Sequence, residues 1–272
     1  MLATLIMIFA RWLLFVGAVG VIGGIGAAVL ARSAGARTRR PVRAAAVIGL
    51  LGTGLLIGAQ LYLWFGVYGF TTLNNVRTML FVTLWGQHWT WLAATSAAAI
   101  VLLWVGRRWP ATWRAANGAA AAGAVAVLPL IGHGGTHDAW TLLWHRLHLL
   151  GAGTWVGTLG VLTVSCITDP KGLVERLRHL APLAFVGALL LMASGLALTW
   201  RHMLPLSTFW TTEYGRVLLA KFAGVIAVAA LGFINWRGPR LKLVVTELLI
   251  AFLVVLVLTA WLSELEPPPL LP

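Results

Sequence analysis

Long apolar runs separated by short polar segments dominate the sequence. Eight runs approach the ~20 residues that an α-helix needs to cross the hydrocarbon of a bilayer. They cover residues 2–31, 44–66, 89–105, 115–131, 144–167, 181–203, 214–234 and 243–263. The fourth run is rich in alanine and only modestly hydrophobic. The pattern predicts an all-α, polytopic membrane protein with eight transmembrane helices in a single domain over residues 1–272.

Basic residues alternate between the connections of these runs. Every second connection is basic, and these connections hold 14 of the 20 Lys and Arg residues: Arg32, Arg37, Arg39, Arg40, Arg43, Arg107, Arg108, Arg114, Lys171, Arg176, Arg178, Arg237, Arg240 and Lys242. Because basic loops are retained in the cytoplasm, we expect this side to be cytoplasmic. The N-terminus and the C-terminus are then both predicted to lie outside the cytoplasm.

Composition supports the same class. Only 10% of the residues are charged and 60% are hydrophobic, whereas a soluble domain has roughly 25% charged residues. The formal net charge of +13 sits in short clusters between apolar runs, which predicts contact with a lipid bilayer and no nucleic-acid partner. Cys166 is the single cysteine, so an internal disulfide and a cysteine-based metal cage are excluded.

Glycines predict where helices approach one another closely. Residues 17–26 include five glycines, which give the first run a small-residue face. Gly54 and Gly58 form one GxxxG pair, and Gly153 and Gly157 form another. Such pairs let helix backbones pack closely in a membrane. We therefore interpret these glycines as packing positions.

Histidines gather on the predicted outer side of the membrane. Six of the seven lie at or near it: His88, His133, His137, His145, His148 and His202. Imidazole binds copper, zinc and haem iron. For any single residue, hydrogen bonding to water or headgroups is the simpler interpretation, but the grouping favours an outward-facing metal site.

The local sequence around these histidines indicates which of them could bind a metal. His133 and His137 lie in the segment GHGGTHD, where the glycines disfavour a helix and let the backbone fold around a ligand. His148 lies at the start of the fifth run, three residues after His145 on the same helix face. His202 precedes Met203, whose thioether suits Cu(I). The predicted metal ligands are His133, His137, His148, His202 and Met203.

Ionisable residues inside the apolar runs form a second set of candidates. A charge within a membrane is costly and usually faces the interior of the helix bundle. We expect Lys221 to meet Glu213 or a polar group near the outer site. Glu247 is expected to meet Asn235, Arg237 or another basic residue near the cytoplasm. These residues, together with Cys166, line either an ion path or a set of structural charge contacts: Glu213, Lys221, Asn235, Glu247 and Cys166.

Motifs for common enzymatic and ATP-driven chemistry are absent. The sequence contains no Walker motif, no Gly-Xaa-Ser-Xaa-Gly elbow and no HExxH zinc motif. It also lacks CxxC and MxxxM copper-relay motifs, and its five methionines are too few to line a methionine channel. We therefore expect a protein that is neither an enzyme nor an ATP-driven pump.

Residues 130–268 contain a series of short motifs in a fixed order. The first are a His-Leu-Leu ahead of Trp-Xaa-Gly, a Ser-Gly in the next helix, and Glu-Tyr-Gly-Arg followed by a lysine. An asparagine at the next cytoplasmic turn, a glutamate early in the last helix and a proline at its exit complete the series. In this order the motifs resemble the copper-resistance D (CopD) family of bacterial inner-membrane proteins, and the resemblance is weaker upstream. The positions that follow the family pattern are His133, His148, Glu213, Lys221, Asn235 and Glu247.

The resemblance implies copper handling at the periplasmic face, with import of copper across the inner membrane. The chain has no Met-rich or His-rich tail and no fused copper-binding domain. Copper would therefore arrive as a free ion or from a separate periplasmic copper-binding protein. Two alternatives stay open. One is a b-type haem electron carrier, with His148 and His202 on one haem, and the other is a copper-loading or assembly factor that transports nothing.

Overall fold

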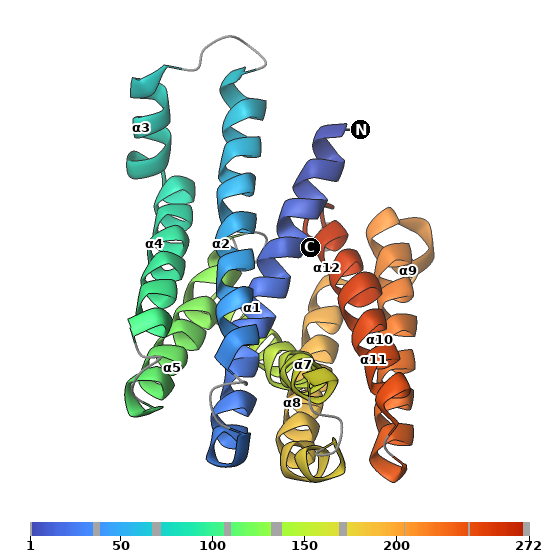
Figure 1. The fold of residues 1–272 in the computed structure, drawn as a ribbon. Coiled ribbons are helices and arrows are strands. Elements are labelled where there is room, and N and C mark those ends of the chain that lie inside the picture. Colours follow the sequence, from blue (N-terminus) through green and yellow to red (C-terminus); the bar gives the residue numbers. More distant parts are fainter. Residues whose placement is uncertain are drawn as a thin grey trace.

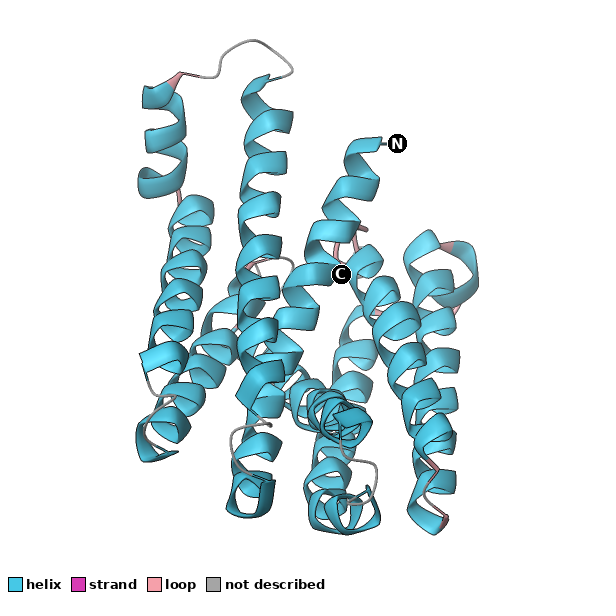
Figure 2. Cartoon of the chain, viewed as in Figure 1, coloured by secondary structure: helices cyan, strands magenta, loops and turns pink. Residues whose placement is uncertain are grey.

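A computed structural model describes most of the chain as helices (Figures 1 and 2). The residues described are 2–34, 39–66, 72–105, 110–131, 138–168, 173–203, 205–238 and 240–268. Within these ranges the structure contains helices and no strand, which confirms the all-α class. His133 and His137 lie outside the described residues.

The described elements follow the predicted runs closely. In chain order, with η marking π-helical and 3-10 segments, they are α1 (Leu2–Ala34), α2 (Arg39–Leu61), η2 (Tyr62–Gly66), α3 (Leu73–Val82), α4 (Leu84–Val105), α5 (Pro110–Val127), η4 (Leu128–Leu130), α6 (Ala139–Ala152), η6 (Gly153–Gly157), α7 (Thr158–Thr168), α8 (Leu173–His202), α9 (Thr208–Thr211), α10 (Glu213–Arg237), α11 (Leu241–Leu249), η8 (Ile250–Val255) and α12 (Leu256–Leu262). Two long helices are composite, because η6 joins α6 to α7 and η8 joins α11 to α12 without a break.

Seven helices in the described part of the chain are long and apolar enough to cross a membrane: Leu2–Gly24, Arg40–Trp64, Leu84–Val105, Ala139–Val164, Val174–His202, Glu213–Arg237 and Leu241–Leu262. They match seven of the eight predicted runs. The fourth run forms α5, which packs against α1 and α4 but is not among the seven. The protein is a multi-pass membrane protein, and the eighth crossing and the placement of both termini outside the cytoplasm stay predictions.

Side-chain contacts define two opposite ends of the bundle. At one end, which we call the terminal end, Arg11 near the start of α1 forms an ion pair with Glu264 just after α12. An apolar cluster of Met203, Val217 and Leu262 brings the ends of α8 and α12 to the start of α10 there. At the other end, which we call the basic end, α7, α8 and α11 meet in a cluster of Leu159, Leu162, Cys166, Leu180 and Val244.

Glycine contacts correct one prediction and confirm another. The backbone of Gly157 lies against Gly23 of α1, and Gly153 lies against Ile22, so this GxxxG pair does mediate close packing. The pair Gly54 and Gly58 does not, because a Cβ added at either position would meet nothing within 4 Å. The α1–α2 contact uses a different set of glycines: Gly17 of α1 with Gly49 and Gly52 of α2.

The π-helical segment η8 supplies an acceptor for the first helix. A π-helix widens the backbone turn and releases a carbonyl group from the regular α-helical pattern. The carbonyl oxygen of Phe252 in η8 accepts a hydrogen bond of 2.7 Å from Nε1 of Trp12. The last composite helix is therefore joined to α1 by this bond and by the Arg11–Glu264 ion pair.

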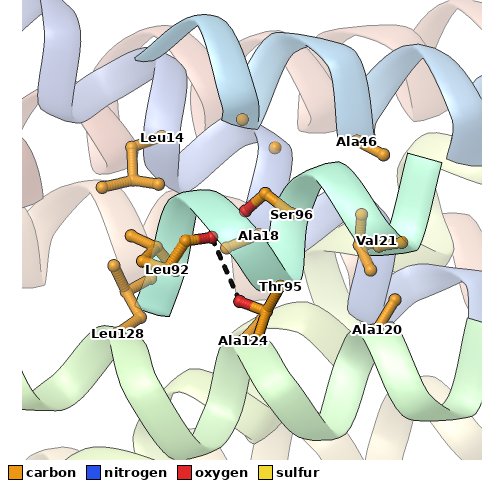
Figure 3. Close-up of a pocket in the computed structure, with 13 residues that line it drawn as sticks. Leu14, Ala18, Val21, Ala46, Leu92, Thr95, Ser96, Ala120, Ala124 and Leu128 are labelled. Atoms are coloured by element: carbon orange, nitrogen blue, oxygen red, sulfur yellow. Dashed lines mark hydrogen bonds between the residues drawn. The ribbon is translucent and has the colours of Figure 1, made fainter. Parts of the chain in front are cut away.

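A small cavity of about 40 Å³ lies between α1, α2, α4 and α5 (Figure 3). Its lining consists mainly of small and aliphatic side chains from these helices. Thr95 is one of the polar residues of the lining. Its hydroxyl group donates to the backbone carbonyls of Trp91 and Leu92 in its own helix, and Figure 3 marks the bond to Leu92. A space of this size is large enough to hold water. None of its lining residues is a histidine, so this cavity is separate from the predicted metal site.

Candidate functional site

The start of α6 is fixed by Asp138, the last residue of the GHGGTHD segment. Its carboxylate accepts hydrogen bonds from the backbone N–H groups of Trp140 and Thr141, at 2.9 and 3.1 Å, and from the Thr141 hydroxyl group at 3.1 Å. These bonds satisfy donors that the first turn of a helix leaves free. They position His145 and His148 one and two further turns along α6.

Asp138 also joins α6 to α8. The guanidinium of Arg201, next to the end of α8, forms an ion pair with the carboxylate. The N–H group of Thr141 and the charge of Arg201 both hold the pKa of Asp138 below its ordinary value. Asp138, which follows His137 in the sequence, is thus joined to the end of the helix that carries His202.

His148 of α6 contacts Ser194 of α8. The Ser194 hydroxyl group donates to backbone carbonyl oxygens of its own helix, that of Leu190 at 2.6 Å and that of Leu191 at 3.1 Å. With its proton used in this way, the hydroxyl oxygen accepts, in the 3.2 Å contact, from the His148 tautomer that carries the imidazole proton on Nδ1. Nε2 of His148 then keeps its lone pair. A metal-binding histidine commonly has this arrangement, with one ring nitrogen donating to a neighbour and the other free to coordinate.

A glycine next to Ser194 makes room for this ring. A Cβ added at Gly195 would lie 3.2 Å from Cε1 of His148. That distance is shorter than an ordinary carbon–carbon contact of roughly 3.5–4.0 Å. The Ser-Gly pair of α8 therefore provides the hydrogen-bond partner of His148 and the space for its ring.

Two further histidine rings lie between the same helices. His202 is buried, and its ring centroid is 6.2 Å from that of His145. Met203 is buried beside it and packs in the apolar cluster at the start of α10. Lys221 of α10 and His145 of α6 both interact electrostatically with His148. The structure thus brings together four of the polar residues of the terminal end: His145, His148, His202 and Lys221.

The arrangement has a limit that the sequence did not predict. Among the residues that the structure describes, no three His, Cys, Asp or Glu side chains are placed to hold one metal ion. The predicted ligands His148, His202 and Met203 lie at the same end of α6 and α8. The sequence did not identify Ser194, Asp138 and Arg201 as supporting residues. Of the three, only Ser194 lies in a motif that the sequence indicated, the Ser-Gly pair.

The second set of candidate residues divides between the two ends. Glu213 is exposed at the start of α10, and Cys166 is buried in the cluster at the basic end. Glu247 of α11 is only 3% exposed and accepts a hydrogen bond of 2.8 Å from Nδ2 of Asn235, itself 2% exposed. Asn235 is one of the partners expected for Glu247.

A comparison with protein families identifies the chain. The profile of the copper resistance protein D-like N-terminal domain matches residues 1–144, which is more than half of the sequence. The chain belongs to the copper-resistance protein D family. The match confirms the family that the resemblance indicated, but it lies mostly upstream of residues 130–268, where the resemblance was strongest. Membership of the copper-resistance protein D family connects this membrane protein to copper resistance or transport. No curated protein and no solved structure matches the chain significantly.

Proposed function

We propose that this protein binds copper at the terminal end of the helix bundle and imports it across the bacterial inner membrane, with no catalytic step. The terminal end then faces the periplasm, in agreement with the predicted orientation. The observation that carries the proposal is the hydrogen bond between His148 and Ser194, because it leaves Nε2 of His148 available as a ligand. Family membership supports copper as the metal.

The neighbouring histidines support a site at this position. Metal–nitrogen bonds are about 2 Å long, so two imidazoles on opposite sides of one ion have ring centroids roughly 6 Å apart. The His145 and His202 rings, at 6.2 Å, have this spacing. Met203 adds a thioether nearby, and His133 and His137 precede Asp138 in the sequence. Copper would continue toward Cys166 and Glu247 at the basic end.

Copper binding is tested first with variants of the hydrogen-bonded pair. His148→Ala removes the proposed ligand and should abolish high-affinity copper binding. Ser194→Ala keeps the ring but removes its hydrogen-bond partner, which for metal sites commonly costs about 10–100-fold in affinity. His179→Ala is the matched control, because His179 is exposed near the basic end and contacts the carbonyl oxygen of Glu175 in its own helix. Titration of detergent-purified protein with Cu(I) and Cu(II) measures these affinities, and unchanged binding in His148→Ala would refute the site.

Lys221 provides a test with the opposite sign. Its positive charge interacts with His148 and therefore opposes a cation bound there. Lys221→Met removes this charge and should raise copper affinity, whereas His148→Ala lowers it. If both variants lower affinity to the same extent, Lys221 supports the site in another way and the electrostatic argument is wrong.

A copper-loading factor and a transporter differ in flux. Protein reconstituted in liposomes should admit copper, and the His148→Ala variant should not. A protein that binds copper but leaves the liposome interior copper-free is a loading or assembly factor, and a periplasmic copper-binding protein would be its source.

The spacing of His145 and His202 also favours a second candidate function, because two imidazoles can ligate one haem iron at that separation. The sequence suggested His148 and His202 for this role, whereas the structure pairs His145 with His202. An absorption spectrum of the purified protein separates the two functions. A haem Soret band that disappears in His202→Ala would replace copper transport with electron transfer.

A further inference from the structure

A buried acid–amide pair lies between α10 and α11, far along the chain from the histidine site. The two helices contact each other at the right of Figure 1. Glu247 is the seventh residue of α11, so its Cα lies ~9 Å along the helix from Leu241 at 1.5 Å per residue. Both Glu247 and Asn235 are almost completely inaccessible. The pair is therefore enclosed by protein and not placed at an exposed helix end.

Of the two polar atoms of the Asn235 side chain, only Nδ2 has a hydrogen-bond partner among the described residues. Its Nδ2 donates to Oε2 of Glu247 at 2.8 Å, but its carbonyl oxygen Oδ1 is buried without a hydrogen-bond partner. A buried acceptor that lacks a donor costs about 1–3 kcal/mol. Such an atom calls for an explanation, because buried polar groups are almost always satisfied.

A proton on the carboxyl group explains this unsatisfied oxygen. A carboxylic acid and a primary amide can form two hydrogen bonds together, N–H to the carboxyl C=O and O–H to the amide C=O. An ionised carboxylate can make only the first of these. A proton on Glu247 therefore completes the pair with Asn235, and it also removes a negative charge that is costly in a membrane interior.

The helices around the pair leave room for the carboxyl group of Glu247 and place few charged side chains near it. A Cβ added at Gly232, one turn before Asn235, would lie 3.0 Å from Oε1 of Glu247. The ionisable residues of α7, α10 and α11 that lie at this end are Arg237, Arg240, Lys242 and Cys166, and the others on α10 (Glu213, Tyr214, Arg216 and Lys221) lie toward its opposite end. Arg240 is exposed at the start of α11. Arg237 is exposed and lies over the Phe233 ring, Lys242 is exposed, and Cys166 is buried in the apolar cluster of α7, α8 and α11.

We infer that Glu247 and Asn235 form a proton-binding site at the basic end of the bundle, and that its proton leaves to water on that side when copper arrives. The exchange balances charge for Cu(I), because one singly charged cation replaces another near the carboxyl group. The proton site stands on the geometry of the pair alone. The exchange for copper rests on the proposed function.

Infrared spectroscopy of the metal-free, full-length protein in detergent tests the proton site. Protonated carboxyl groups give a C=O stretch that shifts in D₂O. We expect this band at neutral pH in the wild type and its loss in Glu247→Gln, which keeps the shape of the side chain. Glu175→Gln is the matched control, because Glu175 is exposed near the start of α8 at the same end. Gly232→Ala should shift the band by crowding Oε1. Absence of the band from the wild type overturns the inference without any variant.

Proton release during copper addition tests the exchange. In weakly buffered detergent solution, Glu247→Gln should release fewer protons than the wild type, by about one per copper bound. Equal release by both proteins overturns the exchange, while the infrared band decides the proton site separately. Loss of copper binding in His148→Ala reports on the proposed function by a third, independent measurement.

Discussion

Gly52 of α2 is a position at which one methyl group should disturb the bundle, and its helix also offers matched controls. A Cβ added there would lie 2.5 Å from the backbone nitrogen of Leu14, 2.9 Å from the carbonyl oxygen of Ala10 and 3.0 Å from the carbonyl carbon of Leu13. Ordinary contacts of carbon are roughly 3.5–4.0 Å. All three atoms belong to the α1 backbone, which cannot rotate away as a flexible side chain can. In Gly52→Ala the two helices must therefore move apart by about 1 Å.

The expected cost follows from two opposing effects. Overpacking of this kind costs about 1–3 kcal/mol, and the backbone contacts place Gly52→Ala at the upper end. Replacement of glycine by alanine inside a helix recovers about 1 kcal/mol. We therefore expect Gly52→Ala to lower the free energy of unfolding by about 2 kcal/mol.

Gly54→Ala and Gly58→Ala are matched controls on the same helix. A Cβ at either position meets nothing within 4 Å, so only the gain in helix propensity remains. Both variants should be as stable as the wild type or more stable by up to about 1 kcal/mol. Unfolding in mixed micelles, followed by the fluorescence of the 15 tryptophans, measures all three. If Gly52→Ala is as stable as the two controls, the close α1–α2 contact is wrong.

Two further predictions concern the ion pairs at the terminal end. Arg11→Met leaves the largely buried Glu264, 16% exposed, without its partner, and should cost about 2 kcal/mol, less than for a fully buried pair. The double variant with Glu264→Gln should recover part of this loss in the same unfolding assay, and a strictly additive loss would contradict the pairing. The second prediction concerns Asp138, whose pKa is lowered mainly by the hydrogen bond from the Thr141 N–H group. The ionised carboxylate therefore stabilises the fold fully at a pH above its ordinary pKa of 3.8. This stabilisation is lost as the pH falls through the lower pKa of the folded protein. Asp138→Asn keeps the helix cap but removes the charge. The Tm of this variant should therefore fall less than that of the wild type between neutral pH and about pH 3. Identical dependence of Tm on pH in both proteins would refute the stabilising role of the Asp138 charge.

The positions of the membrane-spanning helices were predictable because the thickness of the bilayer sets the length of an apolar helix that crosses it. Seven predicted runs correspond to helices of suitable length and hydropathy. The α5 segment was the weakest prediction, since its alanines and glycines make it a helix without strong hydropathy. The orientation of each helix about its own axis was not predictable. Lipid-facing and protein-facing surfaces are equally apolar, so nothing in the hydrophobic pattern distinguishes Gly54 and Gly58 from Gly49 and Gly52.

The candidate site was predictable only in part. His148 and His202 could be selected because imidazoles at one end of neighbouring helices are unusual in an apolar sequence. Ser194 could not, because a serine inside a helix normally bonds to its own backbone, as this one also does. The pairing of Asp138 with Arg201 joins residues 63 positions apart, and no local pattern reports a contact of that kind. The Asn235–Glu247 pair was accessible to reasoning, since a buried glutamate requires a polar partner.

The contacts between α1 and the last composite helix have a consequence for biosynthesis. Arg11 lies inside the first membrane span, and its partner Glu264 is translated 253 residues later. During that interval α1 must remain in the bilayer with an unmatched cation, at a cost of about 2.5–3.5 kcal/mol near the centre of a helix and less toward its end. The most apolar 18 residues within Leu2–Gly24 have a mean hydropathy of 2.4, which is high enough to offset this cost. The final span then closes the bundle from residue 250 onward, when the Phe252 carbonyl and the Glu264 carboxylate reach Trp12 and Arg11. Truncation before these residues should therefore leave an inserted but open helix set, which quality-control proteases can distinguish from the finished protein.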